Sequence, residues 1–287
     1  MGYPFRVRRA VPEDREEVLR ISRAIHQGDW VVGAWEAFMA EPGPGGLYVA
    51  EQEGRMVGFY HLTITERQDA FFSAMRIDPA LQGQGLGSLF CRAQVEQAVA
   101  AGARWIHLFS LLENRAAHRT VEKNGFVNLG EWVIYDSLPC RGTGKNDRAR
   151  PAGAADAPLL GSLRRRLAAD PLDAVIALPH DGWTIQAAAE ADWEPPGWWV
   201  VDGQDGLAGA MLLGTRREGL CIRRLEGSSE AAAELLGAAA DLARSQGCSL
   251  GASLPARSEA LLQALGPDPA AAFRAYVFRR EGAPHQP

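Results

Sequence analysis

The stretch Gln82-Gly83-Gln84-Gly85-Leu86-Gly87 places three glycines in six residues, between two segments of regular pattern. The apolar segment Phe71–Ile77 precedes it and is typical of a strand. An apolar helical pattern follows from about Leu86 to Ala101, and Gly102 ends it. Glycine lets the backbone turn sharply and approach a ligand, while the first turn of a helix adds unpaired N–H groups and a positive dipole end. The stretch therefore predicts a strand–turn–helix site for a pyrophosphate.

Two better-known phosphate loops do not fit this glycine turn. No Lys-Ser/Thr pair follows the glycines, as a Walker loop requires. Ser88 stands where a dinucleotide-binding fingerprint has its third glycine, and the preceding strands form a meander where that fold needs a βαβ unit. An ordinary tight turn between a strand and a helix is the alternative interpretation.

The rest of the N-terminal half predicts an α/β domain around this turn. The segments Leu47–Glu51, Met56–Thr65 and Phe71–Ile77 are joined by short connections, which favours an antiparallel meander. The other expected elements are a strand at Phe5–Arg9, a helix opening at Val11–Asp14, a helix at Val31–Ala40, a strand at Trp105–Leu111, a helix at Asn114–Asn124 ended by Gly125, and a closing hairpin of Phe126–Trp132 and Val133–Ser137.

The C-terminal half repeats this pattern weakly. Arg9-Ala-Val-Pro-Glu-Asp14 has an echo that begins at Arg150 and ends at Asp156, and Leu47-Tyr-Val-Ala50 has one in Trp198-Trp-Val-Val201. The loop-like stretch Pro139–Ala155 separates the halves. We therefore expect two tandem α/β domains, residues 1–138 and 151–287, joined by a linker at 139–150. Each should hold a mixed, mostly antiparallel sheet flanked by helices.

Composition and charge exclude several classes of function. The chain has 287 residues, a net charge of −5 and a pI of about 5.7, which argues against binding to nucleic acid through a general positive field. Four cysteines without a CxxC pair and six histidines without an HxxxH pair predict neither a metal site nor a disulfide scaffold. The sequence shows no apolar signal segment and no run of about 20 apolar residues. We expect a cytoplasmic monomer or homodimer with no metal, membrane or nucleic-acid partner.

Two motifs together resemble the GNAT superfamily of N-acyltransferases. The stretch from Ile77 through Gln82-Gly-x-Gly85 to Gly87 is similar to the family's acyl-CoA loop, Q/R-x-x-G-x-G/A. Asn114-Arg-Ala-Ala117, followed by Glu122-Lys-Asn-Gly-Phe126, is similar to its second motif. The resemblance covers residues 5–137. The C-terminal half matches only in topology and lacks the glycine motif, so the expected second copy is degenerate and binds no acyl-CoA.

The resemblance implies a site for acetyl-CoA. Backbone amides of Gly83–Ser88 would hold the pyrophosphate, and the backbone at Met75–Ile77 would pair with the pantetheine arm like an added strand. The thioester would enter where the strand at residues 71–77 parts from that at 105–111. Asn114 would bond the pantetheine or simply cap the last helix. The implied cofactor-binding residues are Met75, Arg76, Ile77, Gln82, Gly83, Gln84, Gly85, Leu86, Gly87, Ser88 and Asn114.

The family's usual catalytic positions are apolar in this sequence. Val121 stands where many members have a tyrosine that serves as the acid, and Phe71 and Phe109 stand where others have a glutamate. Strand alternation suggests substitutes. His107 shares a face with Phe109 and is the candidate base, while Ser73 or Ser110 could anchor a water. For His61 we expect a structural role and for His118 a place on the surface.

These features predict an acetyl-CoA-dependent N-acetyltransferase that acts on a primary amine of a small molecule by direct attack. The sequence Glu122-Lys-Asn-Gly-Phe126 prompts a first alternative, N-terminal acetylation of a peptide or ribosomal protein. The apolar residues Val121, Phe71 and Phe109 prompt a second, a non-catalytic acyl-CoA-binding regulatory module. The degenerate second copy would help to shape the acceptor site.

Overall fold

A computed structural model describes residues 3–140, 147–167, 169–177, 185–188, 192, 194–195, 197–204, 206–216 and 219–282. The chain forms two compact units. Unit 1 comprises Met1–Asn128 together with Phe278–Pro287, and unit 2 comprises Leu129–Val277.

This division does not coincide with the expected boundaries at 138 and 151. The expected hairpin of residues 126–137 is instead a single strand, β6 (Val127–Tyr135), whose residues from Trp132 onward pair with β13 in unit 2. The end of β14 (Phe273–Glu281) belongs to unit 1, where the Gly282 N–H donates to the Arg104 carbonyl at 2.9 Å. The unit to which β6 or β14 belongs depends on the strands with which it pairs. The loop-like composition of residues 139–155, from which the boundaries were predicted, carries no information on that pairing. Residues 141–146 of the expected linker lie outside the described residues.

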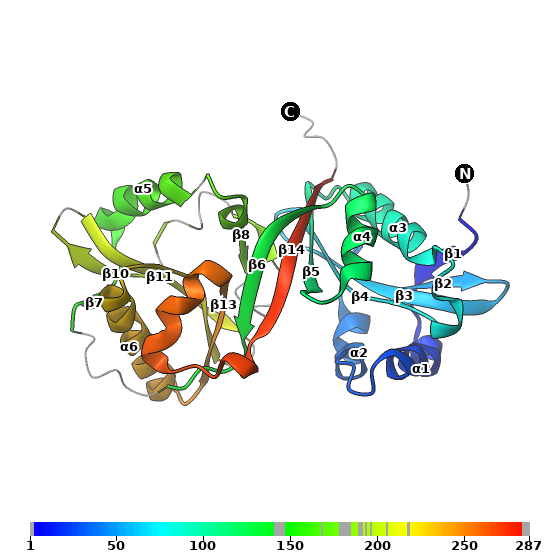
Figure 1. Cartoon of the computed structure of the whole chain (residues 1–287), viewed down its shortest axis with the longest axis horizontal. Coiled ribbons are helices and arrows are strands. Elements are labelled where there is room, and N and C mark those ends of the chain that lie inside the picture. The colour runs from blue at the N-terminus through cyan, green and yellow to red at the C-terminus, as the bar shows by residue number, and fades with distance from the viewer. Residues whose placement is uncertain are drawn as a thin grey trace. The chain divides into compact units, whose positions relative to one another are not determined.

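Unit 1 holds a mixed sheet with helices on both faces (Figure 1). Strands β1 to β4 pair antiparallel in chain order, and β4 pairs parallel with β5. The strands are β1 (Arg6–Arg9), β2 (Gly46–Gln52), β3 (Arg55–Ile64), β4 (Ala70–Ile77) and β5 (Trp105–Leu111). The helices are α1 (Arg15–Ile25), α2 (Val31–Ala40), α3 (Leu86–Ala100) and α4 (Arg115–Lys123).

Burial follows the periodicity of these elements. In α1 the buried side chains include Val18 and Ile21, which recur at helical spacing and pack with Trp35 of α2 against strands β2 and β3. On the opposite face of the sheet, Phe90 of α3 contacts the ring of Tyr60. The sheet is therefore a layer between α1 and α2 on one side and α3 and α4 on the other.

Unit 2 pairs its strands in the same order as unit 1. β7 (Ala149–Pro151), β10 (Trp198–Gly203), β11 (Gly206–Arg216) and β12 (Gly219–Gly227) pair antiparallel in succession, and β12 pairs parallel with β13 (Ser249–Pro255). Helix α6 (Ser229–Gln246) packs through a broad apolar face in one core cluster, and α5 (Ala157–Leu167) packs in another. The short pair β8 (Val175–Ala177) and β9 (Ile185–Ala187) forms a separate small sheet.

One ion cluster occurs in both units with the same geometry. In each, an arginine donates both ends of its guanidinium to an aspartate six residues later, at 2.6–2.9 Å, and also pairs with an acidic residue of the neighbouring strand. The clusters are Arg8, Asp14 and Glu51 in unit 1 and Arg150, Asp156 and Asp202 in unit 2. The hydrogen bonds from the arginines lower the pKa of both aspartates. The sequence echo aligned Arg9 with Arg150, whereas the structure aligns Arg8 with it.

Candidate active site

The glycine turn is exposed and open. Gly83 and Gly85 have φ of +79° and +80°, a conformation that favours glycine, and Gly85 caps the N-terminus of α3. A Cβ atom placed on either residue would meet nothing within 4 Å. The N–H groups of residues 83–87 donate no hydrogen bond to another described residue. Unused donors therefore gather at the positive end of a 15-residue helix, which is the arrangement that binds an anion.

Asp78 fixes the start of the turn. Its buried carboxylate accepts from the Ala80 N–H at 3.0 Å, from Arg20 at 2.6 Å and from Arg55 at 3.2 Å. Burial alone would raise its pKa, but these donors outweigh it and lower the pKa below the usual value. The carboxylate therefore stays charged at neutral pH and ties the end of β4 to α1 and β3.

β4 and β5 part next to the turn. Their parallel pairing begins at Ala70 and ends where Phe72 faces Leu108, so the remaining half of β4 has no partner on that side among the paired residues described. A β-bulge marks the place: Phe59 of β3 pairs with Arg76 and His61 pairs with Ser73, which leaves two residues of β4 opposite one of β3. Ala74 in the bulge has a φ of +52°. The opening offers the free backbone edge that the resemblance implies.

Two side chains beside this edge donate to backbone carbonyls of β4. The Arg76 guanidinium donates to the buried Asp29 carboxylate at 2.8 and 3.1 Å and to the Met75 carbonyl at 3.1 Å. The Gln82 side chain donates to the Ile77 carbonyl at 3.3 Å, which closes the turn back on the strand. A ligand that pairs with the Met75 or Ile77 carbonyl would therefore displace one of these two side chains.

Two further predicted residues have local partners. The Asn114 side chain accepts from the Ala117 N–H at 3.1 Å and caps α4, the simpler of its two expected roles. The Ser88 hydroxyl accepts from Asn124 at 3.1 Å, which joins the start of α3 to the end of α4. Leu86 is buried, and Gly87 lies close to Ile77 and Thr120.

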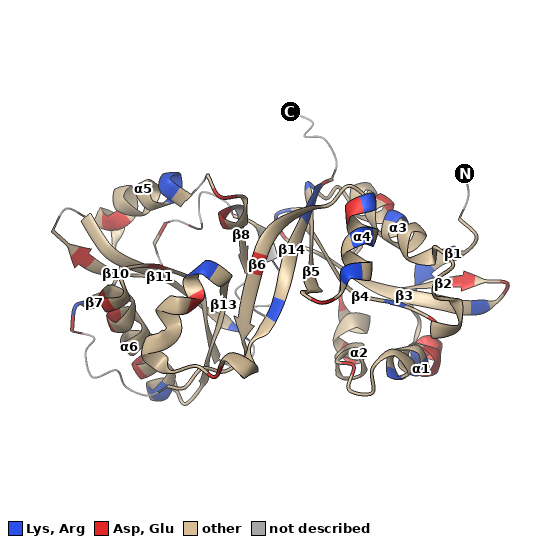
Figure 2. Cartoon of the chain, viewed as in Figure 1, with Lys and Arg blue, Asp and Glu red and all other residues tan. Residues whose placement is uncertain are grey.

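Helix α4 presents cations beside this region. Arg115, Arg119 and Lys123 recur at intervals of four residues and are exposed. Figure 2 marks the positions of Lys and Arg along α4 in blue. They share a helix with Thr120, whose methyl group lies 3.8 Å from the Cβ position of Gly87. These cations thus lie on the helix that approaches the start of α3 through Thr120, and their charge has the sign that complements a phosphate.

Comparison with known proteins identifies this domain. Residues 15–126 match the acetyltransferase (GNAT) family. Unit 1 is a GNAT domain. The curated relatives include mycothiol acetyltransferases from Thermomonospora curvata, 31% identical over 39% of this chain and 39% of the relative, and from Mycobacteroides abscessus, 31% identical over 40% and 43%. The chain thus spans about two fifths of the length of these relatives.

A solved structure extends the likeness to the whole fold. The GCN5-related N-acetyltransferase from Sphaerobacter thermophilus matches with a TM-score of 0.55, covers 100% of this chain and 98% of that one, and is 13% identical. At that identity the match shows the fold alone. It confirms the predicted GNAT-like α/β architecture with a mixed sheet and flanking helices.

Two of the expected absences concern membrane-spanning helices and metal ligands. None of the helices described here has the length and apolar character needed to span a membrane. Across the same part of the chain, no three His, Cys, Asp or Glu side chains gather closely enough to bind a metal ion.

The usual catalytic positions of the GNAT domain are packed with apolar side chains. The rings of Phe71 and Phe109 meet edge to face with centroids 5.5 Å apart, and Val121 is buried in α4. His118, expected at the surface, is half-buried: its ring nitrogen donates to the Leu111 carbonyl at 2.9 Å, and its ring packs against Phe278.

His107 does not fit the role of base that the sequence suggested. Its side chain is fully buried, and neither ring nitrogen has a hydrogen-bond partner among the described residues. Burial and, to a smaller extent, the Arg279 charge lower its pKa to about 3, so the imidazole is neutral and shielded from solvent at pH 7. Ser110, the alternative anchor for a water, is also buried, with its hydroxyl unpartnered in the same part of the chain. The alternation of side chains along a strand predicts which face of β5 His107 occupies. It does not show whether that face lines a cleft or packs in the core.

Ser73 instead joins a polar cluster that sequence reasoning missed. Its hydroxyl lies 2.9 Å from Nδ1 of His61, and Nε2 of His61 lies 2.5 Å from the Glu41 carboxylate. The antiparallel register of β3 and β4 makes His61 and Ser73 direct partners, which a hairpin prediction could have found. Glu41 comes from the end of α2, and no local pattern predicts where that helix packs.

The matching opening of unit 2 is filled by its own chain. β12 and β13 pair from Gly219 to Ile222 and then part at a bulge in β12. The Arg223 guanidinium donates to the Ala177 carbonyl at 2.7 Å, and Arg224 donates to the Val175 carbonyl at 3.1 Å, so both hold β8 against this region. The turn before α6 is closed as well, because a Cβ atom on Gly227 would lie 2.5 Å from the Ala208 carbonyl oxygen.

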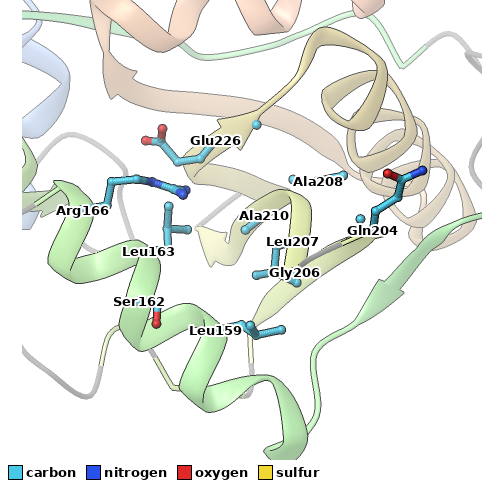
Figure 3. Close-up of a pocket in the computed structure, with 13 residues that line it drawn as sticks. Leu159, Ser162, Leu163, Arg166, Gln204, Gly206, Leu207, Ala208, Ala210 and Glu226 are labelled. Atoms are coloured by element: carbon cyan, nitrogen blue, oxygen red, sulfur yellow. The ribbon is translucent and has the colours of Figure 1, made fainter.

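Unit 2 also contains a cavity of about 550 Å³ between α5 and strands β10 to β12 (Figure 3). Leu159 and Leu163 form an apolar wall, and the side chains of Arg166 and Glu226 extend toward each other at one side. Both oxygens of Glu226 accept from Arg257 at 3.2 Å. This carboxylate is therefore engaged in an ion pair, and we do not place the acyl transfer here.

Proposed function

We propose that unit 1 binds acetyl-CoA and transfers the acetyl group to a primary amine of a small molecule by direct attack. One observation carries the proposal: the unused amides of the glycine turn open beside the free edge of β4. The two features together match a ligand that is a diphosphate at one end and an extended amide chain at the other.

Each part of the cosubstrate has a place in this arrangement. The amides of Gly83–Ser88 and the positive end of α3 would hold the pyrophosphate. The backbone at Met75–Ile77 would pair with the amides of the pantetheine arm as an added strand would. The thioester would then enter the opening beyond Phe72, where the acceptor amine attacks its carbonyl carbon and coenzyme A leaves as the thiol.

The acceptor is assigned from the relatives and from the second motif. The curated relatives are named mycothiol acetyltransferases, which favours a small-molecule acceptor. The stretch Glu122–Phe126, which prompted the peptide alternative, has a structural role, because Gly125 with φ of +82° ends α4 and Phe126 packs on Phe72. It therefore gives no support to a peptide acceptor.

The test separates binding from turnover. Acetyl-CoA binding is measured by calorimetry and by thermal shift in the wild type, in Gly85→Glu and in the matched control Gly33→Glu. Gly33 lies exposed on α2, and a Cβ atom there meets nothing within 4 Å. We expect binding in the wild type and the control and none in Gly85→Glu, because the carboxylate would occupy the phosphate position with like charge.

Turnover is followed as thiol release from acetyl-CoA with a panel of small amines and peptides. Release with small amines supports the proposal. Binding without release from any acceptor would favour the regulatory module, and release only with peptides would favour the peptide alternative. Unchanged binding in Gly85→Glu would refute the placement of the pyrophosphate.

A further inference from the structure

Glu41, His61 and Ser73 come from three elements and meet in one hydrogen-bonded line. Glu41 follows α2, His61 lies on β3 and Ser73 lies on β4. The two contacts measure 2.5 and 2.9 Å, and the His61 side chain is only 7% exposed. A carboxylate can only accept, so Nε2 of His61 carries the proton that faces Glu41. In the neutral imidazole Nδ1 is then an acceptor, and the Ser73 hydroxyl donates to it.

The line ends at the opening between β4 and β5. Ser73 is the first residue after the last β4–β5 pair, and it directly precedes the bulge at Ala74. As a residue, Ser73 is half-buried, whereas Phe72 and Ala74 on either side of it are buried. It therefore lies where the proposed thioester would enter, whereas His107 on the adjacent strand is sealed in the core.

The surroundings hold the cluster in place. The Phe38 ring stacks on the His61 imidazole with centroids 3.9 Å apart. Arg9 of β1 donates to the carbonyl groups of Glu41 and Gly43, which fixes the segment that carries the carboxylate. Gly45 leaves room for that carboxylate, because a Cβ atom there would lie 2.7 Å from its Oε1.

We propose that Ser73, His61 and Glu41 form the proton relay of the acyl transfer, an inference that rests on the proposed function. The nitrogen of the attacking amine bonds to the acetyl carbon and gives a proton to the Ser73 oxygen. At the same time the Ser73 hydroxyl gives its proton to Nδ1 of His61. Glu41 stabilises the imidazolium formed. The carbon–sulfur bond then breaks, and the relay returns the proton to the leaving thiolate. Ser73 is the catalytic residue, and His61 and Glu41 act through it.

Three variants test the relay in the full chain. Ser73→Ala, His61→Gln and Glu41→Gln each remove one link, and His26→Gln removes an exposed histidine outside the cluster. We expect kcat to fall about 100-fold or more in His61→Gln and Ser73→Ala, with the KM for acetyl-CoA changed less than about threefold. The limb of the kcat–pH profile that reports the base should vanish in His61→Gln and persist in His26→Gln.

A fourth variant guards against misfolding. Gly45→Ala removes no polar group, but its Cβ atom would lie 2.7 Å from the Glu41 carboxylate and 3.1 Å from the Leu62 carbonyl oxygen. The carboxylate is the more movable of the two, so kcat should fall moderately, about 3- to 10-fold, while the melting temperature stays within a few degrees of the wild type.

The outcomes distinguish the two proposals. If the wild type transfers acetyl groups and His61→Gln retains kcat within about threefold or keeps the same pH profile, the relay is refuted and the proposed function stands. If the wild type transfers none, both fall. A stable acetyl adduct on Ser73 would also refute the relay, because it would make Ser73 the nucleophile.

Discussion

Units 1 and 2 pair their strands in the same order, yet they treat the opening between the fourth and fifth paired strands differently. In unit 1 the opening beside Phe72 faces a turn with open space around its glycines. In unit 2 the guanidinium groups of Arg223 and Arg224 bind the carbonyls of β8 there, and Ser228 caps the helix that follows. Both units therefore share the separation of the fourth and fifth strands. Whether a ligand can bind there depends on whether side chains such as Arg223 and Arg224 fill the opening. We propose on this basis that unit 2 is a degenerate second copy that binds no acyl-CoA.

The largest effect is expected from removing the contacts of Arg224 that hold β8 in the opening of unit 2. Arg224 is fully buried and donates to Asp173 at 2.8 Å, so Arg224→Met should destabilise the protein by about 3 kcal/mol. Acetyl-CoA affinity should change less than about twofold, because the proposed ligand site lies in unit 1. Urea unfolding and calorimetry measure the two effects, with the exposed Arg165→Met as control. A large loss of acetyl-CoA affinity with an unchanged free energy of unfolding would contradict the proposal that unit 1 alone binds acetyl-CoA.

The next effect concerns the bulge of unit 1. Valine is strongly disfavoured at positive φ, so Ala74→Val should force the bulge to rearrange and weaken acetyl-CoA binding about tenfold, or about 1.4 kcal/mol. Ala74→Gly accepts the same φ and should bind as the wild type does. Equal affinities for the two variants would show that the ligand does not use this edge.

Asp78 should give the site a dependence on pH. Because the folded state lowers its pKa, its stabilising effect is present above the unfolded value, about 4, and is lost as the pH falls through the folded pKa. Asp78→Asn should cost about 1–3 kcal/mol at pH 7 and flatten the fall in stability on the acid side. Unfolding measured at a series of pH values from 7 downward shows this. If Asp78→Asn shows the same slope of unfolding free energy against pH as the wild type, Asp78 is not the source of the pH dependence.

The smallest effect is expected on α4. Arg119 is exposed, so Arg119→Gln should weaken acetyl-CoA binding only a few-fold, and the difference should shrink as salt is added. In unit 2, by contrast, Arg257 after β13 turns inward to Asp173 and Glu226. Binding curves at low and high ionic strength make the comparison, and a difference that does not depend on salt would argue against a charge effect.

The sequence predicted the local elements of unit 1 well because their signals are local. The strand Trp105–Leu111 and the helix Val31–Ala40 have the expected bounds, and the glycine turn lies between β4 and α3. Long-range features escaped prediction. Which sheet β6 joins depends on a partner more than 100 residues away, as the pair Tyr135 and Ala252 shows.

The residues of the proposed proton relay were predicted less well than the glycine turn. Alternation grouped His107 with a cleft face, but packing buried it, and only the docking of α2 brings Glu41 to His61. Ser73 was found because it shares a face with Phe71, although its partner is an imidazole, where the sequence suggested an anchored water.

Calorimetric titration of the wild type and of Gly85→Glu with acetyl-CoA tests the central claim most directly. We expect one molecule bound per chain in the wild type and none in Gly85→Glu, since we propose that the open turn of unit 1 holds the diphosphate and that unit 2 binds no acyl-CoA. Two molecules per chain, or binding that persists in the variant, would contradict it.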